Sequence, residues 1–200
     1  MDCLYVDLDA TLLGPGGSLF LDAEKRFTLL GARALEACAR AGCEVVLMTG
    51  RREDTVRENA RLFSQTSYIF EAGSCVVIEG EEHWLTAPLL PGETTVHDQI
   101  TAVGAPALLL ETYAGRLEYH DPWHADREVS HLFRGLLDTD EADALLAANG
   151  HENLRLLDNG AAHRRSPALA ALRDLRVYHL LWPNPVVQAV RASQPQVKRS

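Results

Sequence analysis

The chain has 200 residues, of which 46% are apolar and 24% are charged, and its formal net charge is -9. These totals are typical of a globular protein with a sizeable core, and the acidic balance argues against general binding to nucleic acid or to anionic membranes. No stretch approaches the ~20 apolar residues that span a membrane, and no signal-peptide pattern opens the sequence. We therefore expect a cytoplasmic protein, and nothing in the sequence indicates its oligomeric state.

The four cysteines lie at positions 3, 38, 43 and 75, without CxxC spacing and without histidines at zinc-finger intervals. We interpret them as small buried apolar residues in a reducing compartment.

The first eighty residues alternate between short apolar runs and helical patterns. Strands are predicted at 4–8, 43–48 and 75–80, a strand followed by a turn at 68–73, and helices at 22–40 and 53–63. Asp22 would cap the first helix and Gly42 would end it. This alternation favours a parallel sheet with right-handed crossovers, so the expected fold class is α/β with a Rossmann-like core.

From about Glu82 the pattern changes, because prolines and glycines interrupt the chain. Helices are predicted near 96–103, 139–148 and 167–172, strands near 107–112, 117–120 and 176–181, and a strand followed by a turn at 154–160. We interpret residues 82–172 as an inserted α+β unit, and residues 1–81 with 173–200 as the core. The stretch 182–200 contains three prolines and no acidic residue, and it predicts a short helix at 186–192 within a frayed tail.

Two carboxylates end the first predicted strand, in the stretch YVDLDATLLG. Asp7 and Asp9 are two positions apart, so they face the same way at the carboxyl end of a strand, where open α/β sheets bind ligands. Two acids there can hold a hard cation, and one can act as a nucleophile while the other carries a proton. Thr11 and the following loop offer donors for phosphate oxygens. For the two acids alone, a solvated strand end is the competing interpretation.

The second predicted strand ends in Met48-Thr49-Gly50-Arg51. A small hydroxyl residue followed by glycine can cradle a phosphoryl oxygen, although Thr-Gly after a strand more often caps a helix. Because both patterns end neighbouring parallel strands in this order, their combination is specific where each alone is weak.

These residues resemble motifs of a known family. Residues 7–13, DLDATLL, and 48–51, MTGR, are similar to the first two motifs of the haloacid dehalogenase-like (HAD) phosphohydrolases, and 68–74, YIFEAGS, resembles the segment that closes the third core strand in the branch with a large α/β cap. Within that branch the chain is most similar to mannosyl-3-phosphoglycerate phosphatases, whose cap segments resemble REVSHLFRG, LRLLDNG and VYHLL. The resemblance covers about residues 3–181.

The resemblance implies a Mg²⁺-dependent phosphatase acting on a small phosphorylated sugar or phosphoglycerate derivative. Asp7 would form an aspartyl-phosphate, Asp9 would protonate the leaving group and then activate water, and Mg²⁺ would be held by the Asp7 carboxylate and the Asp9 backbone carbonyl. The residues implied to contact the phosphate are Thr11, Thr49, Gly50 and Arg51. The unit 82–172 would be the cap, in which Arg134 either binds an anionic substrate group or forms a surface ion pair.

Several residues depart from the family pattern or are set aside. Ala10 and Ala72 stand where relatives usually carry Gly and Asn, and Ala10 is expected to be tolerated if its φ is negative. Asn159 is interpreted as a turn residue. The histidines His120, His124 and His131 are interpreted as surface or cap residues, because their spacing fits no defensible metal site.

Two sequence motifs of the family are missing from their expected place in this chain. Relatives carry a lysine and a further acidic motif after the segment that here reads VYHLL, whereas this sequence continues with WPNPVVQAV, and LLDNG at 156–160 precedes the place where the lysine belongs. We expect an altered or truncated C-terminal part, an incomplete Mg²⁺ site and a first strand left at an exposed edge of the sheet.

Three hypotheses follow. The first is an active HAD phosphatase, and the second is a catalytically incomplete HAD remnant or phosphometabolite-binding protein. The third is a small-molecule mutase of the same superfamily, which the cap similarity disfavours.

Overall fold

The computed structural model describes residues 3–162 and 166–183, and its chain divides into two compact units. Unit 1 is Met1–Leu85 and unit 2 is Thr86–Ser200. No helix in the described part of the chain is long and apolar enough to cross a membrane. The short helix expected at 186–192 lies outside the described residues.

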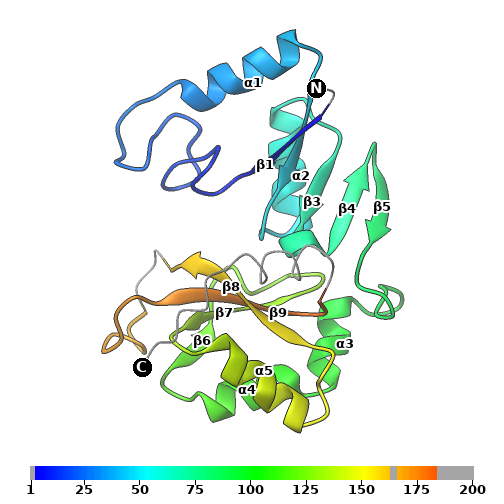
Figure 1. The fold of residues 1–200 in the computed structure, drawn as a ribbon, viewed down its shortest axis with the longest axis vertical. Helices are drawn as coiled ribbons and strands as arrows, with labels where there is room; N and C mark the ends of the chain where they lie inside the picture. Colours follow the sequence, from blue (N-terminus) through cyan, green and yellow to red (C-terminus); the bar gives the residue numbers. More distant parts are fainter. Residues whose placement is uncertain (1–2, 163–165, 184–200) are drawn as a thin grey trace. The chain divides into compact units, whose positions relative to one another are not determined.

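Unit 1 contains a five-stranded sheet in the order β1-β2-β3-β4-β5 (Figure 1). Strands β1, β2 and β3 are parallel, whereas β4 and β5 continue the sheet as an antiparallel hairpin. The elements are β1 (Cys3–Asp7), α1 (Leu30–Arg40), β2 (Glu44–Met48), α2 (Glu53–Leu62), β3 (Tyr68–Phe70), β4 (Cys75–Ile78) and β5 (Glu81–Trp84). A 3₁₀ turn at Glu71–Gly73 joins β3 to β4.

The core of unit 1 forms between the central strands and α2. Val45 and Leu47 of β2 and Phe70 of β3 are buried, as are Val56 and Ala60 on α2. Strand β1 lies at the edge, since among the described residues it pairs only with β2, and Tyr5 at its centre is 62% exposed. The exposed edge that the sequence predicts for this strand is therefore present in the described part of the chain.

Helix α1 starts later than its sequence pattern predicts. Asp22 does not cap it, because the Asp22 carboxylate accepts hydrogen bonds from the backbone N–H groups of Glu24 and Arg26 and closes a tight turn instead. The helix begins at Leu30, and none of its residues is buried. Leu30 itself is 73% exposed.

The described part of unit 2 contains a four-stranded antiparallel sheet in the order β6-β7-β9-β8, with helices on one face (Figure 1). The elements are α3 (Val96–Ala102), α4 (Ala105–Thr112), β6 (Leu117–Tyr119), β7 (His131–Gly135), α5 (Thr139–Ala148), β8 (Arg155–Ala161) and β9 (Arg176–Leu181). Thr95 opens α3 with a capping box and Asp138 caps α5.

Several predicted elements differ from the structure. The apolar run 107–112, predicted as a strand, belongs to helix α4, because Gly104 and Pro106 start a helix that a short apolar run cannot distinguish from a strand. Residues 167–172 form turns rather than a helix. Strand β9, which the expected domain boundaries place in the core, pairs with β7 and β8 in unit 2, and the division falls at Leu85.

Of the three histidines interpreted as surface or cap residues, His120 and His131 are buried within unit 2, whereas His124 is partly exposed. His131 is 1% exposed, and its ring stacks on His97 with 3.8 Å between ring centroids. His124 stacks on Tyr119 at 4.8 Å, and His179 is fully buried. Asn159 lies within β8, beside an irregularity of its register. No group of three or more metal-ligating side chains gathers in the ranges that the structure describes.

Candidate functional site

The two motifs meet at the carboxyl ends of β1 and β2. In this parallel pair, Asp7 lies opposite Met48, and the Leu8 N–H donates to the Met48 carbonyl at 3.2 Å. Asp7 and Asp9 therefore follow one strand at the position where Thr49 follows its neighbour. This is the edge of the sheet at which parallel strands present ligand-binding groups.

A tight turn shapes the segment that carries the acids. The N–H groups of Leu12 and Leu13 both donate to the Leu8 carbonyl, which folds the chain back, and the Thr11 hydroxyl donates to Asp7 Oδ2 at 3.1 Å. Partial burial raises the pKa of the Asp7 carboxyl, and the nearby charge of Asp9 adds to the effect. A cation at Asp7 would favour its charged form.

Ala10 lies in the left-handed region, with φ of 64°. The condition under which alanine was expected to be tolerated here, a negative φ, is therefore not met, because the turn after β1 requires a backbone conformation that glycine adopts most easily. The alanine is tolerated at the cost of local strain.

Arg51 connects the two motifs. Its Nε donates to Asp9 Oδ2 at 2.8 Å and its Nη2 donates to Asp9 Oδ1 at 2.5 Å, so one guanidinium holds one carboxylate through two parallel hydrogen bonds. A Cβ placed on Gly17 would lie 3.3 Å from Arg51 Nη2, so the loop after β1 also approaches this guanidinium closely. Gly17 was not singled out in the sequence, since a glycine in a Gly-Pro-Gly-Gly loop carries no sign of what it approaches.

Thr49 is buried, and its hydroxyl is oriented by a backbone N–H group two residues later in the chain. The Arg51 N–H donates to Thr49 Oγ1 at 3.1 Å. Because this oxygen already accepts a hydrogen bond, the hydroxyl proton is left to donate to a further acceptor such as a phosphoryl oxygen.

The turn after β3 donates backbone hydrogen bonds to the loop that contains Thr49 and Arg51. The Ala72 N–H donates to the Thr49 carbonyl at 3.1 Å, and the Glu71 N–H donates to the Arg51 carbonyl at 3.0 Å. Both Ala72 and Glu71 have positive φ values, of 58° and 44°. The segment YIFEAGS therefore acts through its backbone, a role that its side chains do not reveal.

The acids suit a hard cation only in part. Mg²⁺ is usually held by one or two carboxylates together with waters and substrate phosphates, and the Asp7 carboxylate with the Asp9 backbone carbonyl meets that minimum. Among the described residues no third histidine, cysteine or acidic ligand joins them.

Arg134 lies in unit 2, whereas the motif residues lie in unit 1. It is on β7, directly opposite Glu118 of β6, and its Nε is 2.5 Å from Glu118 Oε1. Its side chain is almost entirely buried. The ion-pair alternative for Arg134 is thus what this structure contains, although the pair is buried rather than on the surface.

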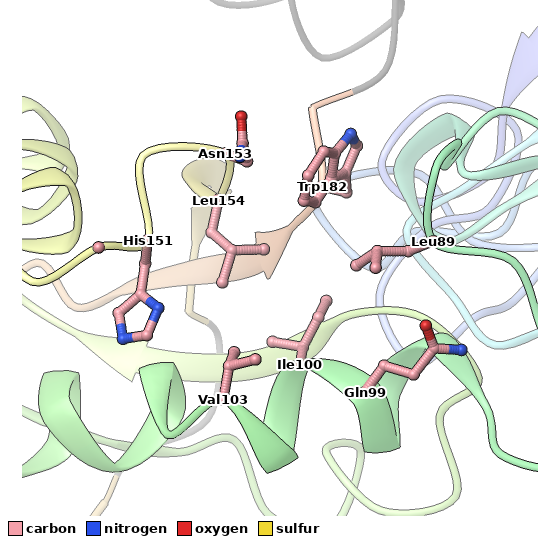
Figure 2. Close-up of a pocket in the computed structure, with 9 residues that line it drawn as sticks. Leu89, Gln99, Ile100, Val103, His151, Asn153, Leu154 and Trp182 are labelled. Carbon is pink, nitrogen blue, oxygen red and sulfur yellow. The ribbon is translucent and has the colours of Figure 1, made fainter.

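A small pocket of about 120 Å³ lies within unit 2 (Figure 2). Figure 2 shows Ile100 and Val103 facing Leu154 across it, with Trp182 and Leu89 at one side. The remaining lining residues are Gln99, Gly150, His151 and Asn153. Among the described residues, no carboxylate or arginine lines this pocket, so the motif residues do not contribute to it.

Comparison with known proteins gives a result for the fold alone. No protein-family model matches the sequence, and no curated protein matches it. Among solved structures, a HAD-superfamily subclass IIB sugar phosphatase is similar with a TM-score of 0.52 and 14% identity, over 96% of this chain and 74% of its own. A sucrose-phosphatase from Synechocystis, solved with sucrose and phosphate, is similar with a TM-score of 0.52 and 13% identity, over 96% of this chain and 69% of its own.

A protein from Thermoplasma acidophilum is similar with a TM-score of 0.53 and 12% identity, over 96% of this chain and 71% of its own. At such low identity these similarities concern the fold and not the activity. They agree with the arrangement of the strands in confirming the predicted class. The chain has an α/β fold with a parallel-strand, Rossmann-like sheet, of the kind found in HAD-superfamily hydrolases.

Proposed function

We propose that this protein is a HAD-type phosphohydrolase, with unit 1 as its catalytic core and unit 2 as its cap. The observation that carries the proposal is the meeting of Asp7 and Asp9 with Thr49 at the ends of two adjacent parallel strands, with Arg51 bridging the motifs. The likeness of the fold to phosphatases of known structure supports it.

Each residue of this cluster has a role in the proposed reaction. The Asp7 carboxylate attacks the phosphorus atom of a phosphomonoester and the bond from phosphorus to the alcohol oxygen breaks, while Asp9, in its protonated form, gives a proton to the departing alcohol oxygen. An aspartyl-phosphate on Asp7 results, and Asp9, now ionised, takes a proton from the water that hydrolyses it. The hydroxyl of Thr49, together with the N–H groups of the loop at Gly50 and the hydroxyl of Thr11, donates to the phosphoryl oxygens.

Arg51 has a second role as a positioning residue. Its two hydrogen bonds fix the orientation of the Asp9 carboxylate, and its positive charge lies beside the place where phosphate charge would gather. Mg²⁺, held by the Asp7 carboxylate and the Asp9 backbone carbonyl, would neutralise charge on the substrate phosphate.

The proposed substrate is a small phosphorylated sugar or a phosphoglycerate derivative. The two phosphatases with similar folds are described as a sugar phosphatase and a sucrose-phosphatase, which supports this class. Arg134 of β7 remains the proposed contact for an anionic substrate group, which would have to compete with Glu118 for the guanidinium.

One observation favours a second candidate, a phosphometabolite-binding protein without turnover. Asp9 is engaged by Arg51, and within the described residues no third ligand completes a metal site. Such a protein would bind the same phosphate group without an available proton carrier.

The test is phosphate release from a panel of sugar phosphates and phosphoglycerates, measured with Mg²⁺ and again with EDTA, using the wild-type chain and Asp7→Asn. We expect release that needs Mg²⁺ and is lost in the variant. Ligand-dependent thermal stabilisation without any phosphate release would instead establish the binding protein. A substrate that Asp7→Asn hydrolyses as fast as the wild type would contradict both.

A further inference from the structure

Two cysteines meet where helix α1 ends. Gly42 has φ of 63°, its N–H donates to the Ala39 carbonyl at 3.2 Å, and the Cys43 N–H donates to the Cys38 carbonyl at 2.9 Å. These two hydrogen bonds define a Schellman motif. In this motif, the side chain of the residue three positions before the C-cap contacts the side chain of the residue that follows the glycine. In this chain both of those side chains are cysteines.

The two cysteines are partly exposed to solvent. Cys38 and Cys43 are both half-buried, so small reagents can reach them, whereas Cys75 in β4 is fully buried. Desolvation raises the pKa of the Cys43 thiol, and the adjacent Cys38 thiol raises it further. Cys3, at the start of β1, contributes a smaller effect and lies opposite Glu44, the residue after Cys43. The expectation of four buried cysteines is thus met only at Cys75.

We propose that Cys38 and Cys43 form an oxidative modification site, in which a hydroperoxide converts the two thiols to a disulfide across the end of α1. One thiol is first oxidised to a sulfenic acid while the peroxide O–O bond breaks and the oxidant is reduced. The second sulfur then attacks that sulfenic sulfur, an S–S bond forms and water leaves. Overall, two thiols lose two electrons and two protons, and the hydroperoxide is reduced to an alcohol, or to water when it is hydrogen peroxide.

The geometry favours this pair over the other thiols. The Schellman hydrogen bonds hold the two cysteine backbones together before oxidation, so the bond requires little rearrangement. The bond would tie the C-terminal end of α1 to the residue that precedes β2. Because α1 buries none of its own residues, this end is where the helix is joined to the sheet.

Tryptic mapping tests the proposal directly. Cleavage after Arg33, Arg40 and Arg51 places Cys38 in the peptide ALEACAR and Cys43 in AGCEVVLMTGR. After treatment of the folded chain with hydrogen peroxide at pH 8.5 and quenching of remaining thiols, we expect these two peptides to be joined, 2 Da lighter than their sum. A reductant should separate them. The rate should rise with pH between 7 and 8.5, since the thiolate is the reacting form.

Matched variants make the result specific. Cys3→Ser should keep the joined peptides, whereas Cys38→Ser and Cys43→Ser should each abolish them. The proposal is overturned if Cys38 and Cys43 are recovered unlinked after peroxide treatment that oxidises other residues of the chain, or if the bond that forms involves Cys3. Because mapping of the wild-type chain alone decides between these outcomes, the test does not depend on the folding of any variant.

Discussion

Strand β1 of unit 1 and strand β7 of unit 2 are equally long but differ completely in burial. None of the five residues of β1 is buried, whereas all five residues of β7 are. Within the described residues, the strand that carries the proposed nucleophile lies at an edge of its sheet, whereas β7 lies between β6 and β9 in a sheet with helices on one face (Figure 1). We infer that the proposed chemistry is placed on the less buried of these two strands, where local motion costs less than in a buried strand.

The largest expected effect tests this contrast through packing. Phe133→Ala in β7 removes a fully buried ring that contacts Tyr119 and His131, and we expect a loss of about 3–5 kcal/mol in the free energy of unfolding. Tyr5→Ala in β1 is the matched control, and it should cost less than about 1 kcal/mol, because that ring is mostly exposed. Urea denaturation of the two variants measures both, and equal losses would remove the contrast.

The next effect concerns catalysis in unit 1. Arg51→Ala removes both hydrogen bonds to Asp9, and we expect kcat/KM for phosphate release to fall about 100-fold, or about 2.7 kcal/mol. Arg51→Lys should recover only part of this, because an ammonium cannot form the paired bonds. Arg52→Ala, whose guanidinium pairs with Asp54, is the control. Recovery of Arg51→Ala by added guanidinium ion would separate positioning from a general structural loss, and an unchanged rate in that variant would contradict the role.

The third effect is a pH dependence that originates in unit 2. Burial and the neighbouring His97 lower the pKa of His131 to about 3, and burial lowers that of His179 well below its usual value. Because the unfolded chain takes up these protons near pH 6.5 and the folded chain does not, acidification favours unfolding. Each histidine should cost up to about 1.4 kcal/mol per pH unit as the pH falls below 6.5, and for His131 the loss should be complete near pH 3.

Urea denaturation at pH 7.5, 6.5 and 5.5 measures this slope. His131→Phe, which keeps an aromatic ring between its neighbours, should lower the slope by about half. If the slope between pH 6.5 and 5.5 were the same in this variant, the assignment to His131 would fail.

The smallest effect returns to unit 1. Ala10→Gly relieves a left-handed alanine and should stabilise the chain by up to about 1 kcal/mol. Ala60→Gly, at a buried position inside α2, is the opposite control and should destabilise by at least about 1 kcal/mol. A destabilising Ala10→Gly would mean that the methyl group contributes a contact that outweighs the strain.

The sequence predicted those features that depend on period and local spacing. The alternation of apolar runs located β1, β2 and α2, and the motif residues on β1 and β2 were correctly expected to end adjacent strands. It did not predict that 107–112 is helical, because a short apolar run carries no clear period. The start of α1 was missed because the Asp22 side chain closes a turn as readily as it caps a helix.

The residue types of the candidate site were predictable from the sequence, whereas the hydrogen bonds and backbone conformations within the site were not. The paired hydrogen bonds from Arg51 to Asp9 join residues 42 positions apart, and no local pattern encodes such a distance. Likewise, the left-handed backbone at Ala10 depends on the turn that Leu12 and Leu13 make with Leu8, and alanine gives no sign of it.

The turn at Glu71–Gly73 has a consequence for how the sequence can change over time. It supports the Thr49 and Arg51 loop through backbone N–H groups, which every residue except proline possesses. Substitutions that tolerate the positive φ of these turn positions would therefore leave the loop in place, and Ala72 occupies such a position. Where a site is held by main-chain contacts, homologous proteins can lose most of their sequence identity and still keep the backbone conformation of the site. The fold of such a chain can therefore be similar to solved structures even when its sequence matches no family model.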